Sequence, residues 1–170
     1  MTTVTLLLLA RVLHILGGVI WAGSMFALSF AIIPIAARHA DDGAGRWTAQ
    51  VSRRLGPVSG ISAVVTVLSG MYLFATLHKG DMSVGGIVLG AGAAAAVLSL
   101  LVGVLIGRPT GLRMAKLQSE GSNQSAATLA ELASLRGRVA WSSRLAGILL
   151  GLAVLSMAVF RYAPAFAAAG

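Results

Sequence analysis

The chain has 170 residues, of which 57% are hydrophobic and 11% are charged, with a formal net charge of +8 and no cysteine. Soluble domains carry about a quarter charged residues, so this composition excludes an ordinary soluble domain and indicates an integral membrane protein. Without cysteine there are no disulfides, thiolate metal ligands or thiol redox chemistry. The basic residues gather in loops between apolar runs, which indicates membrane orientation and not nucleic-acid binding.

Four apolar runs follow one another along the chain, over residues 12–37, 58–78, 84–107 and 140–160. Each is close to the ~20 residues that a helix needs to cross a hydrocarbon core of roughly 30 Å. Backbone groups in lipid must pair within their own segment, so we predict an all-α, four-helix integral membrane bundle that forms one domain over residues 1–170. The first run lacks a basic n-region and a convincing cleavage site, so we expect a retained helix and not a signal peptide.

The loops differ in basic residues, and this difference predicts the orientation. The two long loops, around residues 38–57 and 108–138, contain nearly all of the basic side chains outside the spans: Arg38, Arg46, Arg53, Arg54, Arg108, Arg113, Lys116, Arg136 and Arg138. The short second link has only Lys79 and the tail only Arg161. The positive-inside rule then places both long loops in the cytoplasm and both termini on the outer, periplasmic side. The composition is rich in Ala and Gly, which we take as prokaryotic, so the predicted location is a bacterial inner membrane.

Within the first long loop, Trp47, Val51 and Leu55 recur every four residues, opposite the arginines. This spacing predicts a short amphipathic helix on the inner leaflet, ended by Gly56 and Pro57 before the second span begins. Pro34 is expected to kink the end of the first span. A shared helical face of leucines in the second long loop predicts that the fourth helix starts before the membrane; these are Leu129, Leu132 and Leu135.

Small residues recur at intervals of four in the last two spans. They are Gly86, Gly90 and Ala94, then Gly103 and Gly107, and finally Gly147 and Gly151. Small residues at this spacing let two helix backbones approach closely. Tight packing within the bundle is the favoured interpretation. The alternative is contact with a membrane-protein partner or a second copy, in addition to the lipid bilayer.

An ionisable side chain, His14, lies inside the first apolar run, on one helical stripe with Gly17, Gly18, Trp21 and Met25. This arrangement suits a haem b site. The imidazole would coordinate the iron, the glycines would leave room for the macrocycle, Trp21 would pack on its edge, and Arg11 would pair with a propionate. The alternative is structural: a neutral His14 bonded to a neighbouring helix, glycines and Trp21 that serve packing alone, and Arg11 as an interfacial anchor.

Further candidate ligands fall at the same level as His14 in the outer half of the membrane: Met71, Tyr72, His78 and Met157. For a second axial ligand we consider His78 first, then Met71 or Met157, or none if the iron is five-coordinate. A metal site of His14 and His78 is thus one expectation. The sequence places these side chains at one level without showing that they face one another.

The first span, "RVLHILGGVIWAGSMFALSFAIIP", resembles the first helix of the copper-resistance D family and of the haem-binding membrane protoporphyrinogen oxidase family. Both tend to open with a "LH(L/I)(L/I)G…(V/I)W.(A/G)G" run. The order of "RRLGPVSGISAVVTVLSGMYLF" and "RGRVAWSSRLAGILLGLAVLSM" also fits. The resemblance implies that His14 is the family's first-helix histidine, in a haem b protein or one that handles copper. The third span lacks the lysine and histidine usual in the oxidase family, which argues against protoporphyrinogen oxidation.

The function predicted from these residues is haem b binding through His14, for electron transfer or for oxidation of a membrane-accessible substrate. One alternative is a copper-handling membrane domain that uses His14, His78 and methionines. Another is a structural or assembly subunit without a cofactor. The chain contains no phosphate-binding loop, no H-E-x-x-H motif and no Ser-His-Asp set with credible spacing.

Overall fold

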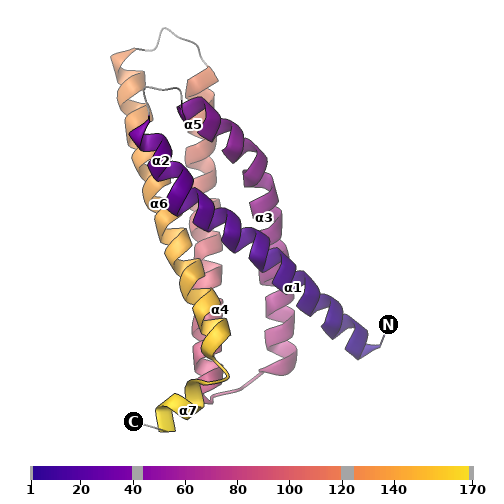
Figure 1. The fold of residues 1–170 in the computed structure, drawn as a ribbon. Helices are drawn as coiled ribbons and strands as arrows, with labels where there is room; N and C mark the ends of the chain where they lie inside the picture. Colours follow the sequence, from indigo (N-terminus) through magenta and orange to yellow (C-terminus); the bar gives the residue numbers. More distant parts are fainter. Residues whose placement is uncertain (1, 40–43, 120–124, 169–170) are drawn as a thin grey trace.

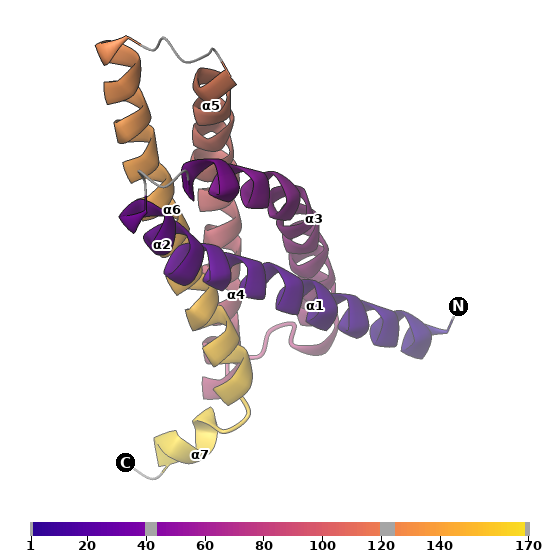
Figure 2. The ribbon, with the colours of Figure 1, turned by 45° about the horizontal axis from the view of Figure 1, so that its top comes forward.

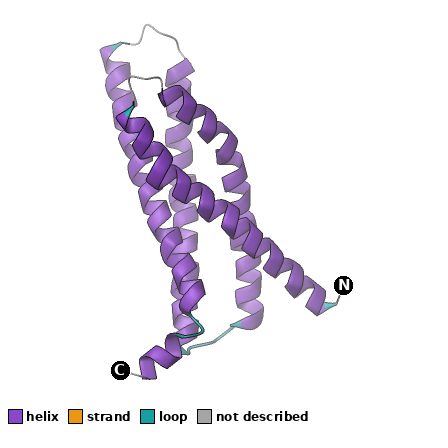
Figure 3. Cartoon of the chain, viewed as in Figure 1, coloured by secondary structure: helices purple, strands orange, loops and turns teal. Residues whose placement is uncertain are grey.

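The computed structural model describes residues 2–39, 44–119 and 125–168, and these residues fold into helices without a strand (Figure 3). The first long helix comprises α1 (Thr3–Phe26), a π-helical turn η1 (Ala27–Ile32) and α2 (Ile33–Arg38). The second is α3 (Ala44–Leu77). The third comprises α4 (Val84–Val102), a second π-helical turn η3 (Gly103–Gly107) and α5 (Arg108–Ser119). The fourth is α6 (Ala126–Val159), followed by the short α7 (Ala163–Ala168).

These four helices are long and apolar enough to cross a membrane, which confirms the predicted all-α membrane bundle. Each is longer than the apolar run that predicted it, because the backbone hydrogen bonds of the helix continue into the polar residues beyond that run. The first described residues and α7 lie at the same end of the bundle (Figure 1). Placement of that end outside the cell stays a prediction.

The helices pack as two pairs, α1 on α3 and α4 on α6 (Figure 1). The pairs meet in a core of small and large apolar side chains, which are Trp21, Ala63, Ala96, Leu150 and Ala153. Towards its N-terminus α1 diverges from α4 and α6 and runs out beside α3 (Figure 2). The N-terminal half of α1 therefore has α3 as its main neighbour.

Both π-helical turns precede a proline. In η1 the N–H of Ile33 donates to the carbonyl of Leu28, and Pro34 follows. After η3 the N–H of Arg108 donates to the carbonyl of Gly103, and Pro109 follows. Because proline has no N–H, the regular ladder must skip a carbonyl, and a turn widened by one residue accommodates this. Where we expected a kink from Pro34, the structure has this widened turn.

Residues 44–55 are helical as expected, but the prediction that Gly56 and Pro57 end that helix is wrong. α3 runs without interruption through Pro57. The ring removes only the N–H that would bond to the carbonyl of Arg53, which bends a helix and does not need to end it. Figure 2 shows the first turns of α3 leaning across the end of the bundle.

The small-residue face predicted for the third span has the wrong register. A Cβ added at Gly92 would lie 2.6 Å from Cβ of Ser156, so this glycine permits the close approach of α4 and α6. Gly90 has no neighbouring atom nearer than 4.0 Å, and Ala94 is exposed. Gly103 has none within 4 Å.

The glycines of the fourth span pack within the bundle as predicted. A Cβ at Gly147 would lie 3.0 Å from Phe30 and 3.2 Å from the hydroxyl of Ser29. One at Gly151 would lie 3.7 Å from Phe26. These glycines therefore allow the C-terminal half of the first helix to pack closely against α6.

The early start of the fourth helix is confirmed. α6 begins at Ala126, and its Leu132 and Leu135 are buried against Leu117 of α5. Leu129 is exposed. This second cluster joins α5 and α6 beyond the predicted apolar runs.

Candidate functional site: the contact of His14 with α3

His14 bonds across the contact between α1 and α3. Its Nδ1 lies 2.8 Å from the backbone carbonyl oxygen of Thr66. A carbonyl oxygen can only accept, so Nδ1 carries the hydrogen and donates it. In the neutral ring the lone pair is then on Nε2.

The second nitrogen of His14 is accessible. The side chain is half-buried, and no described residue forms a hydrogen bond with Nε2. Within the described part of the chain, no buried side-chain nitrogen or oxygen lacks a partner, so Nε2 must reach the protein surface. One ring nitrogen is thus fixed by the protein, while the other presents a lone pair.

Two glycines, one on each helix, make this contact possible. A Cβ at Gly70 would lie 2.7 Å from Cε1 and 2.9 Å from Nδ1 of His14. One at Gly17 would lie 2.7 Å from the hydroxyl oxygen of Thr66 and 3.2 Å from the carbonyl oxygen of Ser62. Any side chain at either position would separate α1 from α3.

The face of α3 at this contact carries a stripe of small polar residues, which sequence reasoning missed: Ser59, Ser62, Thr66 and Ser69. Two of the four hydroxyls donate to carbonyls of their own helix. Thr66 donates to the carbonyl of Ser62 at 2.7 Å, and Ser69 to that of Val65 at 2.6 Å. Spacings of three, four and three residues place them on one helical face. That spacing was the signal that could have identified α3 as the partner of His14.

The other stripe residues of α1 serve packing in this structure. Gly17 does not leave room for a macrocycle as expected, because Thr66 occupies the space beside it. Gly18 makes only an ordinary contact, 3.6 Å from Thr66 to an added Cβ. Trp21 is 4% exposed and packs in the core with Leu150, so its position matches the structural alternative.

Arg11 lies one turn from His14 towards the N-terminus and is exposed. No residue in the described part of the chain forms an ion pair with it. Its pairing with a propionate stays a prediction.

His78 is held at the far end of α3, away from His14. Its Nδ1 lies 3.5 Å from a carboxylate oxygen of Asp81, and its ring packs edge-on against Phe160 with a centroid separation of 5.8 Å. It follows Gly70 by two helical turns, about 12 Å along the axis. The structure therefore does not bring the two histidines together at one metal ion.

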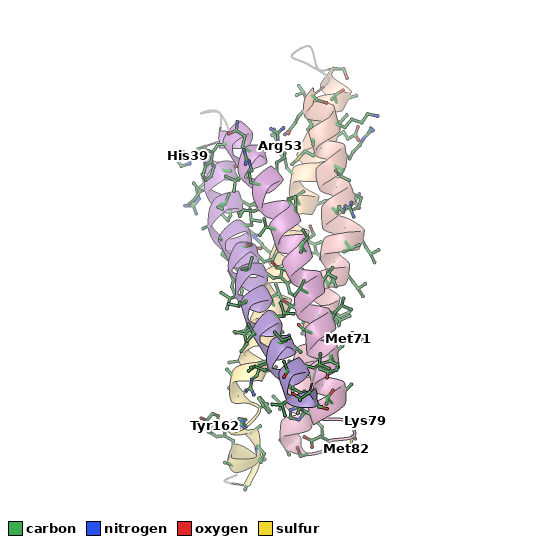
Figure 4. All side chains as sticks on the ribbon, turned by 90° about the vertical axis from the view of Figure 1, so that its right-hand side faces the viewer. His39, Arg53, Met71, Lys79, Met82 and Tyr162 are labelled. Carbon is green, nitrogen blue, oxygen red and sulfur yellow. The ribbon has the colours of Figure 1, made fainter. Side chains whose placement is uncertain are left out.

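The two methionines differ in direction. Met71 is 60% exposed and lies on the outside of the bundle (Figure 4). Met157 is half-buried and lies two turns beyond Leu150 on the same face of α6. Because α1 diverges from α6 towards its N-terminus (Figure 2), no contact among the described residues joins Met157 to His14, and its role as a second ligand stays a prediction.

Across the described ranges, no group of three or more His, Asp or Glu side chains could hold a metal ion. The site consists of one oriented imidazole within a membrane-spanning helix. Such a group can accept one hydrogen bond or coordinate one metal whose other ligands come from elsewhere. Comparison of the chain with protein-family models, with characterised proteins and with solved structures finds no match.

Proposed function

We propose that this chain is a bacterial inner-membrane protein that binds haem b through Nε2 of His14, for electron transfer or for oxidation of a membrane-accessible substrate. The observation that carries the proposal is the bond from His14 to the carbonyl of Thr66. Histidines that coordinate metals almost always donate their other N–H to a carbonyl, carboxylate or water, which fixes the tautomer and the ring orientation. His14 has this partner and an accessible Nε2.

The number of protein ligands favours haem over copper. A porphyrin supplies four nitrogens to its iron, so one or two protein ligands complete the site. A copper site must take its ligands from His, Met or Cys side chains along the path. The described residues offer His14 alone, because α1 diverges from the helix of Met157, while His78 and Met71 lie elsewhere. The family resemblance of the first helix agrees with this choice of His14.

Each residue of the site has a distinct proposed role. His14 would be the axial ligand, Thr66 orients its ring, and Gly70 leaves the space that the ring needs. His14 is the single proposed protein ligand of the iron, and Arg11 would pair with a propionate in the headgroup region. When bound, the haem supplies one-electron transfer.

The test is the visible spectrum of detergent-purified protein, oxidised and dithionite-reduced, after expression with added haem. We expect a Soret band with α and β bands on reduction in the wild type. His14→Ala and His14→Asn should both lose these bands. The Asn amide can still donate to the carbonyl of Thr66 but has no atom at the position of Nε2, so His14→Asn should keep the thermal stability of the wild type.

Three outcomes would contradict the proposal. A colourless wild type would contradict haem binding. Metal analysis for copper would then test the alternative of a copper-handling membrane domain. A fully coloured His14→Asn protein would show that Nε2 is not the ligand. A colourless, copper-free wild type whose fold and function survive His14→Ala would favour the cofactor-free assembly subunit.

A further inference from the structure

The first turns of α3 carry a mixed polar and apolar face that the site at His14 does not use. Trp47, Gln50, Val51 and Arg54 recur at helical spacing on one side of α3, and Arg53 flanks them. Together with Leu55 these residues line a shallow pocket of about 800 Å³. Figure 4 shows Arg53 at the end of the bundle that carries His39, opposite Lys79 and Tyr162.

The two arginines of this pocket have no neutralising partner in the described ranges. Both are exposed, and the ion pairs found there join His78 to Asp81 and Arg113 to Glu131 instead. Both arginines line the pocket, so their positive charges favour an anion there. Arg113 by contrast already has a carboxylate partner at 2.8 Å.

The pocket lies where the membrane surface must be. The predicted apolar run of α3 starts at Val58, one turn after Arg54 and about 6 Å along the axis. Trp47 is 55% exposed, as expected for a side chain in the headgroup region. The first turns of α3 lie across the end of the bundle (Figure 2).

We propose that this pocket binds the headgroup of an anionic phospholipid. The guanidinium groups of Arg53 and Arg54 would hold the phosphate, since their planar donors match its oxygens. The Gln50 amide adds a donor, and Trp47, Val51 and Leu55 supply an apolar wall for the glycerol and upper acyl chain. The chemistry thus fits a phosphate attached to an apolar body.

The test compares two double variants that remove equal charge. Arg53→Gln with Arg54→Gln empties the pocket of guanidinium groups. Arg136→Gln with Arg138→Gln removes two exposed arginines of α6 and serves as the matched control. Native mass spectrometry and thermal shift would measure binding of phosphatidylglycerol, phosphatidylcholine or inorganic phosphate to the full chain in detergent.

We expect the wild type and the control to bind and be stabilised by phosphatidylglycerol but not by phosphatidylcholine. The pocket variant should lose about tenfold or more in affinity, because each arginine near an anionic surface contributes about 1 kcal/mol. Equal losses in the two variants would mean non-specific charge attraction and would overturn the proposal. Equal binding of phosphatidylcholine would also do so.

Competition by inorganic phosphate as strong as that by the lipid would point to a free-anion site and would overturn the lipid assignment. Each variant without lipid must melt like the wild type before the affinities are compared. The pocket lies about 24 Å along α3 from Gly70, so its test does not depend on whether the protein binds haem.

Discussion

Among the described residues, two side-chain hydrogen bonds join the first helix to its neighbours, one in each half of the bundle. They differ in whether the donor side chain has a further accessible polar atom. Ser29 donates to the carbonyl of Ser143 on α6 at 2.7 Å, and His14 donates to that of Thr66 on α3 at 2.8 Å. Ser29 is 1% exposed. His14 forms the equivalent interhelix hydrogen bond with Nδ1 and still has an accessible Nε2. A hydroxyl suffices for an interhelix bond, so the imidazole brings an atom that packing does not require.

The acceptor sides of the two bonds share one local arrangement. In each, a glycine follows the accepting residue by four positions: Thr66 with Gly70 in "TVLSG", and Ser143 with Gly147 in "SRLAG". The N–H of that glycine already bonds the carbonyl within the helix. The missing Cβ then leaves room for a second donor from the first helix. The difference between the two regions therefore lies in the donor.

The largest effect expected from this comparison is that of Gly70→Ala. The new Cβ would lie 2.7 Å from the imidazole, so the ring must move and its bond to Thr66 must break. We expect a loss of about 1–3 kcal/mol in unfolding free energy, typical of overpacking. We also expect most of the haem absorbance to be lost. Thermal melts and the reduced visible spectrum would measure the two effects.

Gly18→Ala is the matched control for this substitution. Its Cβ would meet Thr66 at 3.6 Å, an ordinary contact, so stability and spectrum should stay near those of the wild type. If Gly70→Ala keeps the full spectrum and stability, the ring does not depend on the geometry described.

Ser29→Ala should separate packing from cofactor binding. It removes one interhelix bond, and such bonds contribute about 0.6 kcal/mol on average and up to about 1.7 kcal/mol in membrane proteins. We expect a loss of that size in stability with an unchanged haem spectrum. Loss of haem in Ser29→Ala would show that the two halves are coupled, and the distinction between them would fail.

Gly147→Ala should have a smaller effect than Gly70→Ala, although the two glycines hold equivalent positions. An added Cβ would lie 3.0 Å from Phe30, whose side chain is 53% exposed and can shift outward, and 3.2 Å from the Ser29 hydroxyl, against 2.7 Å from the imidazole at Gly70. Alanine also favours the helix by up to about 1 kcal/mol relative to glycine. We expect the unfolding free energy, measured by thermal melting, to change by no more than about 0.5 kcal/mol. The cost of crowding and the gain in helix propensity nearly cancel. A loss as large as that of Gly70→Ala would contradict this account of the two contacts.

The comparison also explains how far the sequence alone could be interpreted. The four helices were predictable because lipid requires long apolar segments with internal backbone pairing. The faces through which these helices pack were not predictable. Lipid and the bundle interior are similarly apolar, so the hydrophobic pattern does not show which side of a helix faces the bundle. Gly90 and Gly92 both looked suitable for packing, and only Gly92 meets α6.

At the candidate site, the sequence identified His14 as exceptional but not its partner. The polar face of α3 around Thr66 consists of residues that each look ordinary in a membrane helix. Their role as the contact face for His14 becomes apparent only in the structure, where α1 packs against them. Gly17 and Trp21 are covered by other helices in this structure, which a stripe shared with His14 could not indicate.

The smallest effect is expected at Asp81 and Ser83, two exposed residues that precede α4. Ser83 caps α4 by accepting from the N–H of Gly86 at 3.1 Å, and its own N–H donates to Asp81 at 3.0 Å. The Ser83 hydroxyl, and then its backbone N–H, hold the pKa of Asp81 below its ordinary value. A lowered pKa stabilises the fold at pH values above the ordinary one, and this stabilisation is lost as pH falls through the folded-state value.

We therefore expect the difference in melting temperature between wild type and Asp81→Asn to be present at neutral pH, to decline below about pH 4, the ordinary pKa of an aspartate, and to be lost below the lower folded-state value. It should be smaller than the shift of Ser29→Ala, because solvent screens an exposed carboxylate. His78 faces Asp81 at 3.5 Å and also lowers the pKa of that carboxylate. A His78→Gln background removes its contribution. A difference in that background which stays constant down to the lowest pH would show that the charge of Asp81 does not support the cap.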